Sequence, residues 1–168
     1  MSALILNRQI VTNDLALLDD EAALPASGKA VVSLARWQQQ NGELRQAAVE
    51  IGVRLPNTVD VATIWADLKD RKLIVVDFPG FGDGRAYSQA RLLRDRYDFQ
   101  GDIVATGGAV VRDQILGMHR SGINGFLLRA DQDPDVCLTA FNDFITAYQK
   151  ASDVKTTIVR EERRDRAL

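Results

Sequence analysis

The residues best suited to chemistry gather in two glycine-rich segments. One spans 78–85 and holds three glycines with Asp83 and Arg85, and the other spans 106–114 and leads from two glycines to Arg112. Glycine lets backbone amides approach a ligand, and arginine binds a carboxylate, sulfur oxyanion or phosphate through paired hydrogen bonds. A helix that begins behind each loop adds free N–H groups and a partial positive charge. The pattern indicates an anion site or a surface for a partner.

The same residues also have a purely structural interpretation. Asp83 can cap the following helix, the glycines can build tight turns, and Arg85 can pair with Asp113. Phe81 can plug the end of the sheet or offer an apolar patch to a partner. The structural, docking and anion-binding interpretations all remain open from the residues alone. The positions concerned are Phe81, Asp83, Gly84, Arg85, Gly107, Gly108, Arg112, Asp113 and Gln114.

Known nucleotide and phosphotransfer motifs fail at particular residues. Gly80-Phe81-Gly82 begins a dinucleotide-like pattern, but Arg85 stands where a third glycine is required. A phosphorylated receiver domain would use an acid such as Asp77 together with an acidic pair that holds magnesium. The strand predicted first along the chain ends at Ser33-Leu34-Ala35 without such a pair. We therefore predict no phosphotransfer.

Cysteine and histidine counts exclude several cofactor classes. The chain has one cysteine, Cys137, and one histidine, His119. An intrachain disulfide, a self-contained Cys/His zinc site and a four-cysteine cluster are therefore impossible. Cys137 falls on a predicted apolar helix face, which is typical of a buried thiol. We expect no metal and no cofactor, and the sequence contains no catalytic signature.

From residue 30 onward, short apolar runs alternate with segments of helical spacing. The predicted strands are 30–34, 53–55, 73–78, 102–106 and 125–129. The predicted helices are 43–51, one capped by Asn57 or Thr58, one at about 86–97, one that ends near Gly122, and one that begins at Pro134 and carries Cys137, Phe141, Phe144 and Tyr148 on one face.

Five strand–helix units with short links predict an α/β fold with a five-stranded, mainly parallel sheet and flanking helices. A flavodoxin-like strand order is favoured, and half of a β/α barrel is the alternative. Either way, both glycine-rich segments follow the carboxyl ends of strands, where ligands bind in open α/β sheets. We predict an N-terminal arm with a short hairpin at 1–27, a single α/β domain at 28–149, and a charged, flexible tail at 150–168.

Composition bounds the partners and the location. The 168 residues are 46% hydrophobic and carry a formal net charge of -2. Without a basic excess we expect no nucleic-acid partner. No apolar run approaches the roughly 18 residues that span a bilayer, and no secretory signal is evident, so we expect a cytoplasmic protein without a membrane partner. The arm at 1–27 is a candidate element for homo-oligomerisation.

A specific pattern lies in 78–94, where Phe-x-Asp-Gly-Arg at 81–85 is followed by Tyr-Ser at 87–88 and Ala-Arg-Leu-Leu-Arg at 90–94. Together with Gly-Asp at 101–102 and Arg-Asp-Gln at 112–114, it resembles a bacterial family known as domain of unknown function nine hundred and thirty-four. The resemblance covers nearly the whole chain. It adds Tyr87, Ser88, Arg91 and Arg94 to the positions of interest, without a catalytic role for any of them.

The resemblance also implies a pathway. The family's genes typically lie beside those of assimilatory sulfite or nitrite reductase, and its members are often labelled oxidoreductases of sulfite reduction. The chain departs from the expected pattern at Ile103-Val104, where a basic or bulky residue is expected, and this argues against an anion site across that loop. Redox chemistry normally belongs to a cofactor, and no flavin, nicotinamide or cluster motif is present.

These considerations lead to two functional hypotheses. The first is an accessory protein of assimilatory sulfite reduction, in sulfur assimilation, that docks on the sulfite or nitrite reductase or supplies electrons to it. The second is a small anion- or nucleotide-binding enzyme or sensor that uses the two glycine-rich loops. The second requires Arg85 and Arg112 to converge on one cleft, whereas arginines spread over a flat surface with an exposed Phe81 favour the first.

Overall fold

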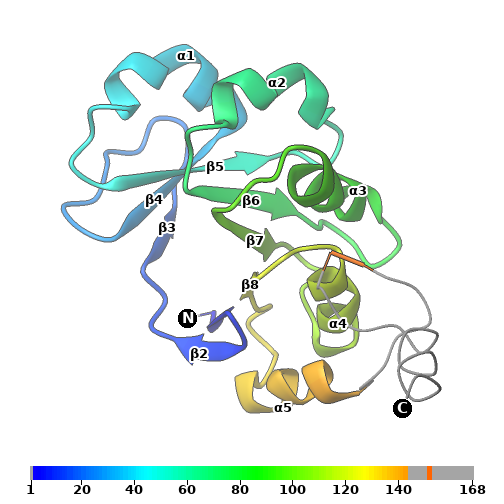
Figure 1. Cartoon of the computed structure of the whole chain (residues 1–168). Helices are drawn as coiled ribbons and strands as arrows, with labels where there is room; N and C mark the ends of the chain where they lie inside the picture. The colour runs from blue at the N-terminus through cyan, green and yellow to red at the C-terminus, as the bar shows by residue number, and fades with distance from the viewer. Residues whose placement is uncertain (1, 144–150, 153–168) are drawn as a thin grey trace, which may run out of the picture.

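An eight-stranded sheet with helices along its outer side makes up the protein, in a computed structural model that describes residues 2–143 and 151–152 (Figure 1). The strands are β1 (Leu4–Leu6), β2 (Gln9–Val11), β3 (Leu15–Leu17), β4 (Lys29–Ser33), β5 (Glu50–Leu55), β6 (Leu73–Asp77), β7 (Asp102–Thr106) and β8 (Gly125–Leu127). The helices are α1 (Leu34–Leu44), α2 (Val61–Leu68), α3 (Arg85–Arg91), α4 (Arg112–Arg120) and α5 (Pro134–Thr139), with the π-helix η1 (Leu92–Arg96) and the 3-10 helix η2 (Ala140–Asn142).

Strand order follows chain order from β3 to β8. Each of these strands pairs in parallel with the next one along the chain. The favoured flavodoxin-like order is therefore wrong, and the alternative is confirmed as a curled half-barrel. A flavodoxin-like sheet reverses its direction of growth once, whereas here each right-handed crossover steps the same way and keeps the helices on one side. Local sequence does not encode that step, because a strand–helix unit looks the same in both arrangements.

The sheet has eight strands rather than five, and it is mixed rather than purely parallel. At one edge β1 pairs antiparallel with both β2 and β8, and at the other edge β3 extends the parallel part. The hairpin of β1 and β2 turns at Asn7 and Arg8, which have φ angles of 50° and 63°. Strands of three residues carry too little periodicity to be recognised from sequence, which explains the wrong count.

The two edges of the sheet come close together. Only residues 12–14 separate the end of β2 from the start of β3, so the facing ends of these edge strands lie within about 15 Å of each other. The backbone N–H of Lys29 donates to Asp14 O at 3.0 Å and ties this connection to the start of β4. The hairpin at the N-terminus is consequently part of the curled sheet, and Ile5 within β1 is fully buried.

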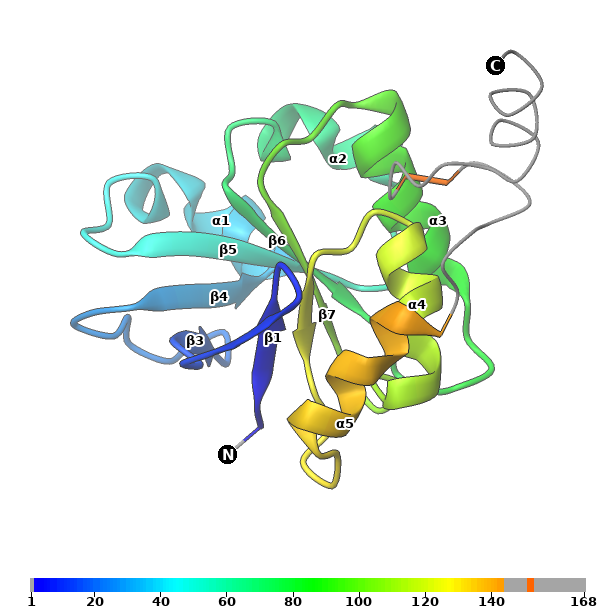
Figure 2. The ribbon, with the colours of Figure 1, turned by 60° about the horizontal axis from the view of Figure 1, so that its bottom comes forward.

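Both faces of the sheet are packed. The convex face, with side chains such as Val53, Val76 and Phe126, packs against the helices, which follow one another around the outside from α1 to α5 (Figure 2). The concave face forms a second core of its own around Val31, Val75 and other apolar residues of the inner side. The interior of the curl is therefore filled with side chains, as in the core of a β/α barrel.

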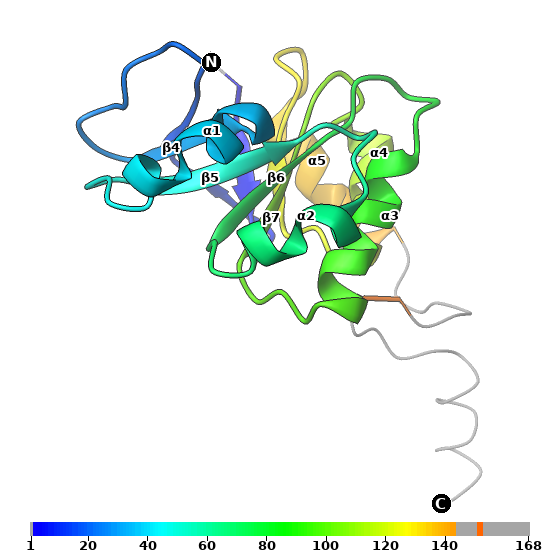
Figure 3. The same ribbon diagram turned by 90° about the horizontal axis from the view of Figure 1, so that it is seen from above.

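The largest local error concerns the first helix. A helix was expected at 43–51, but the chain is helical from Leu34 to Leu44 and extended from Glu50 to Leu55 (Figure 3). Ser33 begins the helix, since its hydroxyl accepts a hydrogen bond from Arg36 N at 3.0 Å. Burial of Trp37 against Arg45 and Arg71 then anchors it, which outweighs the weak helical periodicity of its glutamine-rich stretch.

Most other elements lie close to their predicted positions. The strand at 102–106 is confirmed residue by residue, and Pro134 begins α5 behind Asp133, whose carboxylate caps the helix. The second helix is capped by Asp60 rather than by Asn57 or Thr58. The predicted helix at about 86–97 is present but divides into α3 and η1. Phe144 and Tyr148 of the predicted last helix, and the predicted tail apart from Ala151 and Ser152, lie outside the described residues.

Candidate functional site

The loop after β6 is held at its base by an ion pair. Arg85 donates from Nε to Oδ1 of Asp83 at 2.9 Å and from Nη2 to Oδ2 at 2.6 Å. The side-chain amide of Asn57 donates to the same Oδ2 at 2.6 Å. The hydrogen bonds from Arg85 hold the pKa of Asp83 well below its usual range, and Asp83 raises the pKa of Arg85. Arg85 thus pairs within its own loop rather than with Asp113, directly after the N-cap residue Gly84.

Phe81 projects from the tip of this loop. A turn in which Asp83 N donates to Gly80 O at 3.0 Å shapes the tip. The Phe81 side chain is 70% exposed, more than any other large apolar side chain in the described part of the chain, whereas Phe78 is buried against the sheet. Phe78 therefore closes the sheet end, and Phe81 remains an exposed aromatic side chain at the loop tip.

The glycine pair after β7 is packed against the loop after β6. Gly107 has a φ of 109°, and a Cβ there would lie 2.4 Å from the carbonyl oxygen of Phe78. Gly108 accepts a hydrogen bond at its carbonyl from Arg129 Nη1 at 3.2 Å. The space that a ligand would need beside Gly107 is occupied by backbone of the neighbouring loop, so glycine is required here for close packing of two loops.

Arg112 is bound by residues in and around α5. Its Nη2 lies 2.7 Å from Oδ1 of Asp143 and 3.2 Å from the Thr139 hydroxyl, both near the end of α5. Its backbone N–H donates to Gln132 Oε1 at 3.1 Å. Asp113 is well exposed and lies 3.6 Å from Arg112 Nη1. Arg112 therefore joins α4 to the segment around α5.

The remaining predicted positions lie on α3 and in its contact with α4. The Tyr87 hydroxyl donates to Gln114 Oε1 at 2.6 Å, and its ring packs edge-on against Phe78 at 5.0 Å. Burial raises the pKa of Tyr87, which indicates a structural hydroxyl. Ser88 and Arg91 lie on the exposed side of α3, where Arg91 Nε is 3.0 Å from Asp95 Oδ2 one turn later.

The structure thus sorts the predicted positions into separate groups rather than into one cleft. Arg85 and Arg112 are engaged by different carboxylates, those of Asp83 and Asp143. Neither arginine lines the pocket at the amino ends of the strands or the pocket beside Ser88 and Arg91. We name the surface formed by Phe81, the Asp83–Arg85 pair and the adjoining Gly107-Gly108 loop the carboxyl-end face.

Asp77 and Arg54 lie near the carboxyl ends of β6 and β5 and were not among the predicted site positions. Asp77 ends β6 on the concave side, next to Thr106 in the register of the sheet. Burial raises the pKa of the Asp77 carboxyl, and the charge of Arg54 on β5 opposes that rise. Within the described residues the Asp77 carboxylate accepts no hydrogen bond. An acid that ends a buried strand was visible in the sequence, but its approach to Arg54 depends on strand order.

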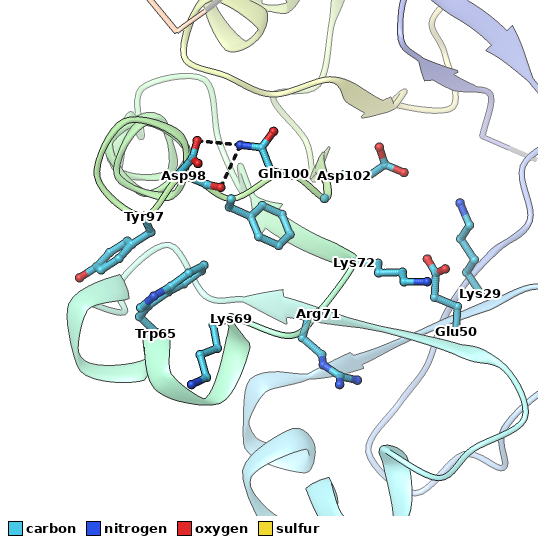
Figure 4. Close-up of a pocket in the computed structure, with 12 residues that line it drawn as sticks. Lys29, Glu50, Trp65, Lys69, Arg71, Lys72, Tyr97, Asp98, Gln100 and Asp102 are labelled. Carbon is cyan, nitrogen blue, oxygen red and sulfur yellow. Dashed lines mark hydrogen bonds between the residues drawn. The ribbon is translucent and has the colours of Figure 1, made fainter.

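A pocket of about 610 Å³ lies at the opposite end of the sheet (Figure 4). The segment 69–72 before β6 and the loop 97–101 before β7 form its walls, and Trp65 and Tyr97 lie at one end of it. We name it the amino-end pocket, because Lys29 and Glu50 at the starts of β4 and β5 line its other end. Sequence reasoning missed it, since its residues come from five separate segments.

The described ranges hold neither a candidate metal site nor a candidate membrane span. In residues 2–143 and 151–152, no three His, Cys, Asp or Glu side chains are grouped so that they could hold a metal ion. None of the helices in the same ranges has the length and apolar character needed to cross a membrane.

Fold and site together define a half-barrel α/β protein with an ordered loop surface at one end of its sheet and a charged pocket at the other. Residues 52–159 match the family described as bacterial protein of unknown function (DUF934), and the chain belongs to this family. The match includes both glycine-rich segments. No curated protein and no solved structure matches the chain.

Proposed function

We propose that this protein is an accessory protein of assimilatory sulfite reduction that docks on the reductase through the carboxyl-end face. The observation that carries docking is Phe81, an aromatic side chain that is 70% exposed on a loop held by the Asp83–Arg85 ion pair. Aromatic and arginine side chains supply most of the binding energy in protein interfaces. A loop that is already ordered loses little conformational entropy when a partner covers it.

The pathway part of the proposal comes from the family to which the chain belongs. Its resemblance to proteins encoded beside assimilatory sulfite or nitrite reductase makes that reductase the expected partner. The separate ion pairs of Arg85 and Arg112 favour docking over an anion site in the two glycine-rich loops. Docking, rather than electron supply, is the role that an exposed aromatic side chain supports.

A binding measurement tests the docking surface. The sulfite reductase of the same organism is titrated onto the immobilised full chain, and Phe81→Ala is compared with the natural sequence. We expect binding to weaken at least about tenfold, as for other central aromatic contacts. Val136→Ala is the matched control, because Val136 is also an exposed apolar side chain, 50% exposed, and belongs to α5 rather than to this loop. Equal affinity of the Phe81→Ala chain would contradict the proposal.

A growth experiment tests the pathway. A deletion strain is grown with sulfate, sulfite, sulfide or cysteine as the only sulfur source. The proposal predicts failure on sulfate and sulfite, with rescue by sulfide and cysteine. A complementing Arg85→Ala copy that accumulates normally should rescue growth poorly, because its loop loses the bonds to Asp83. Normal growth of the deletion strain on all four sources would rule the pathway out.

A further inference from the structure

The loop that carries Phe81 is held on both sides by other segments of the chain. On one side, Ala109 N donates to Phe78 O at 3.1 Å, which fixes the start of the loop against the segment after β7. On the other side, Asn57 Nδ2 donates to Asp83 Oδ2 at 2.6 Å. Asn57 lies in the turn between β5 and α2, 26 residues before Asp83 in the chain. Phe81 therefore projects from a loop whose two ends are bound to different parts of the molecule.

A buried glutamine of α3 fixes the turn that bears Asn57. Gln89 is 4% exposed, and its Nε2 donates to Pro56 O at 2.8 Å and to Val59 O at 2.9 Å. The turn also closes on itself, since Val59 N donates to Pro56 O at 3.1 Å. Buried hydrogen bonds of this kind are costly to break, because each would leave a polar group unsatisfied. The Asn57 donor thus belongs to a segment that is itself fixed to α3.

The Asn57 side chain serves this contact and not the helix that follows it. Asp60 caps α2, since its carboxylate accepts a hydrogen bond from Ala62 N at 2.9 Å. Asn57 donates instead to the same carboxylate oxygen that accepts from Arg85 Nη2. Arg85 is only two residues from Asp83, so their ion pair fixes the shape of the loop. The bond from Asn57 fixes the position of the loop relative to β5 and α2.

We propose that Asn57 is a positioning residue of the docking surface. It acts through Asp83, and it holds the loop in the arrangement that presents Phe81 to the partner. This inference rests on the proposed docking function. A side chain that is arranged before contact loses less conformational entropy on binding, so the residue that arranges it contributes to affinity indirectly.

Binding of the sulfite reductase of the same organism to the immobilised full chain tests this function of Asn57. We expect Asn57→Ala to weaken binding by about threefold to tenfold, because the Asp83 end of the loop is released. Thr58→Ala is the matched control, because Thr58 is an exposed neighbour in the same turn whose side chain makes no hydrogen bond within the described residues. Its affinity should equal that of the natural chain.

A double-mutant cycle distinguishes positioning from general destabilisation. If Asn57 acts through the Phe81 loop, Asn57→Ala should weaken binding in the natural chain and have no further effect in the Phe81→Ala chain. An equal loss of affinity in both backgrounds would overturn the proposal. Unchanged binding by Asn57→Ala, while Phe81→Ala binds weakly, would overturn the positioning function and leave docking intact. Unchanged binding by Phe81→Ala would overturn both.

Asn57→Asp provides a readout that needs no partner. The substitution keeps the shape of the side chain but replaces its donor by a second carboxylate beside Asp83. In the natural chain, the hydrogen bonds from Arg85 and then from Asn57 hold the pKa of Asp83 well below its usual range. Two carboxylates that share a site do not ionise independently, so one of them should titrate at a raised pKa in the variant. NMR titration of the carboxyl carbons measures this pKa. An unchanged titration of Asp83 would overturn the contact on which the positioning function depends.

Discussion

The two ends of the half-barrel use basic residues in opposite ways. Near the carboxyl ends of the strands, Arg85, Arg112 and Arg129 each lie within 2.7 Å of an aspartate oxygen. At the amino ends, Lys29, Lys69 and Lys72 form no ion pair within the described residues, although carboxylates line the same pocket. The forked guanidinium binds a carboxylate in a fixed geometry and holds loops in place, whereas the compact ammonium of lysine stays hydrated more readily. Basic residues therefore fix loops at the carboxyl ends of the strands and not at the amino ends.

Arg94→Ala has the largest expected effect, and it acts near the amino ends of the strands, where Arg94 holds the segment before β7. The substitution removes the donors of three backbone carbonyls and of Asn124 Oδ1, so we expect the free energy of unfolding to fall by about 3 kcal/mol. Urea unfolding measures this loss. Docking through Phe81 should persist. Arg91→Ala, which removes an exposed pair with Asp95, should change stability by less than about 0.5 kcal/mol. Equal losses of unfolding free energy in both variants would contradict the structural importance of the Arg94 hydrogen bonds.

Gly107→Ala acts on the other end of the sheet with a smaller effect. The positive φ and the close approach of Phe78 O disfavour a Cβ, and we expect a loss of about 2 kcal/mol in urea unfolding. Gly80→Ala serves as the control, since a Cβ there meets no atom within 4 Å. Docking should weaken in the Gly107 variant alone. Equal docking by both variants would contradict a contribution of the Gly107-Gly108 loop to the carboxyl-end face.

Asp77→Asn has the smallest expected effect on stability. The pH dependence of the free energy of unfolding tests it. Because burial raises the folded-state pKa of Asp77 above its unfolded value, the folded chain holds the proton more tightly. The charged form of Asp77 therefore destabilises the folded chain. This loss of stability is absent below the unfolded-state pKa of about 3.9 and fully present once the pH exceeds the folded-state pKa of Asp77. We expect Asp77→Asn to be more stable than the natural chain at neutral pH, with little gain near pH 3, in urea unfolding at both pH values.

Asp131 supplies a control of opposite sign. The hydrogen bond from Arg129 lowers the pKa of Asp131 to about 2. A carboxyl with a depressed folded pKa stabilises the fold above its unfolded pKa, and this contribution is lost as pH falls through the folded pKa. Asp131→Asn should therefore be slightly less stable at neutral pH and no different at very low pH. If Asp77→Asn shows the same trend as Asp131→Asn, the environment assigned to Asp77 is wrong.

Sequence reasoning succeeded where the signal is local. The β-branched run at 73–78 and the segment 102–106 are strands because continuous apolar runs must be buried on both sides. The placement of both glycine-rich loops at the carboxyl ends of strands is also confirmed, since the loops follow β6 and β7, whose ends pair at Asp77 and Thr106. The helix expected at 43–51 failed because its four apolar positions belong to different elements. Leu44 ends α1, Ala47 and Ala48 lie in the connection, and Ile51 lies in β5.

The candidate sites were recovered only in part. The pattern at 81–85 was recognised as one element, but its structural interpretation paired Arg85 with Asp113, whereas Arg85 pairs with Asp83. The partner of Arg112 could not be foreseen, because Asp143 is 31 residues away and its approach depends on how α5 packs on α4. The amino-end pocket could not be foreseen at all, since it brings Lys29 beside residues 69–72 and 97–102.

By itself the sequence determined the strand–helix alternation, the positions of most elements, and the placement of both glycine-rich segments after strands, because these depend on local periodicity and turn residues. The tertiary structure decided the strand order, the entry of β1 beside β8, the carboxylate that each arginine binds, and the meeting of three lysines in one pocket. These features depend on the direction in which each crossover steps and on contacts between distant segments, which no local stretch of sequence specifies.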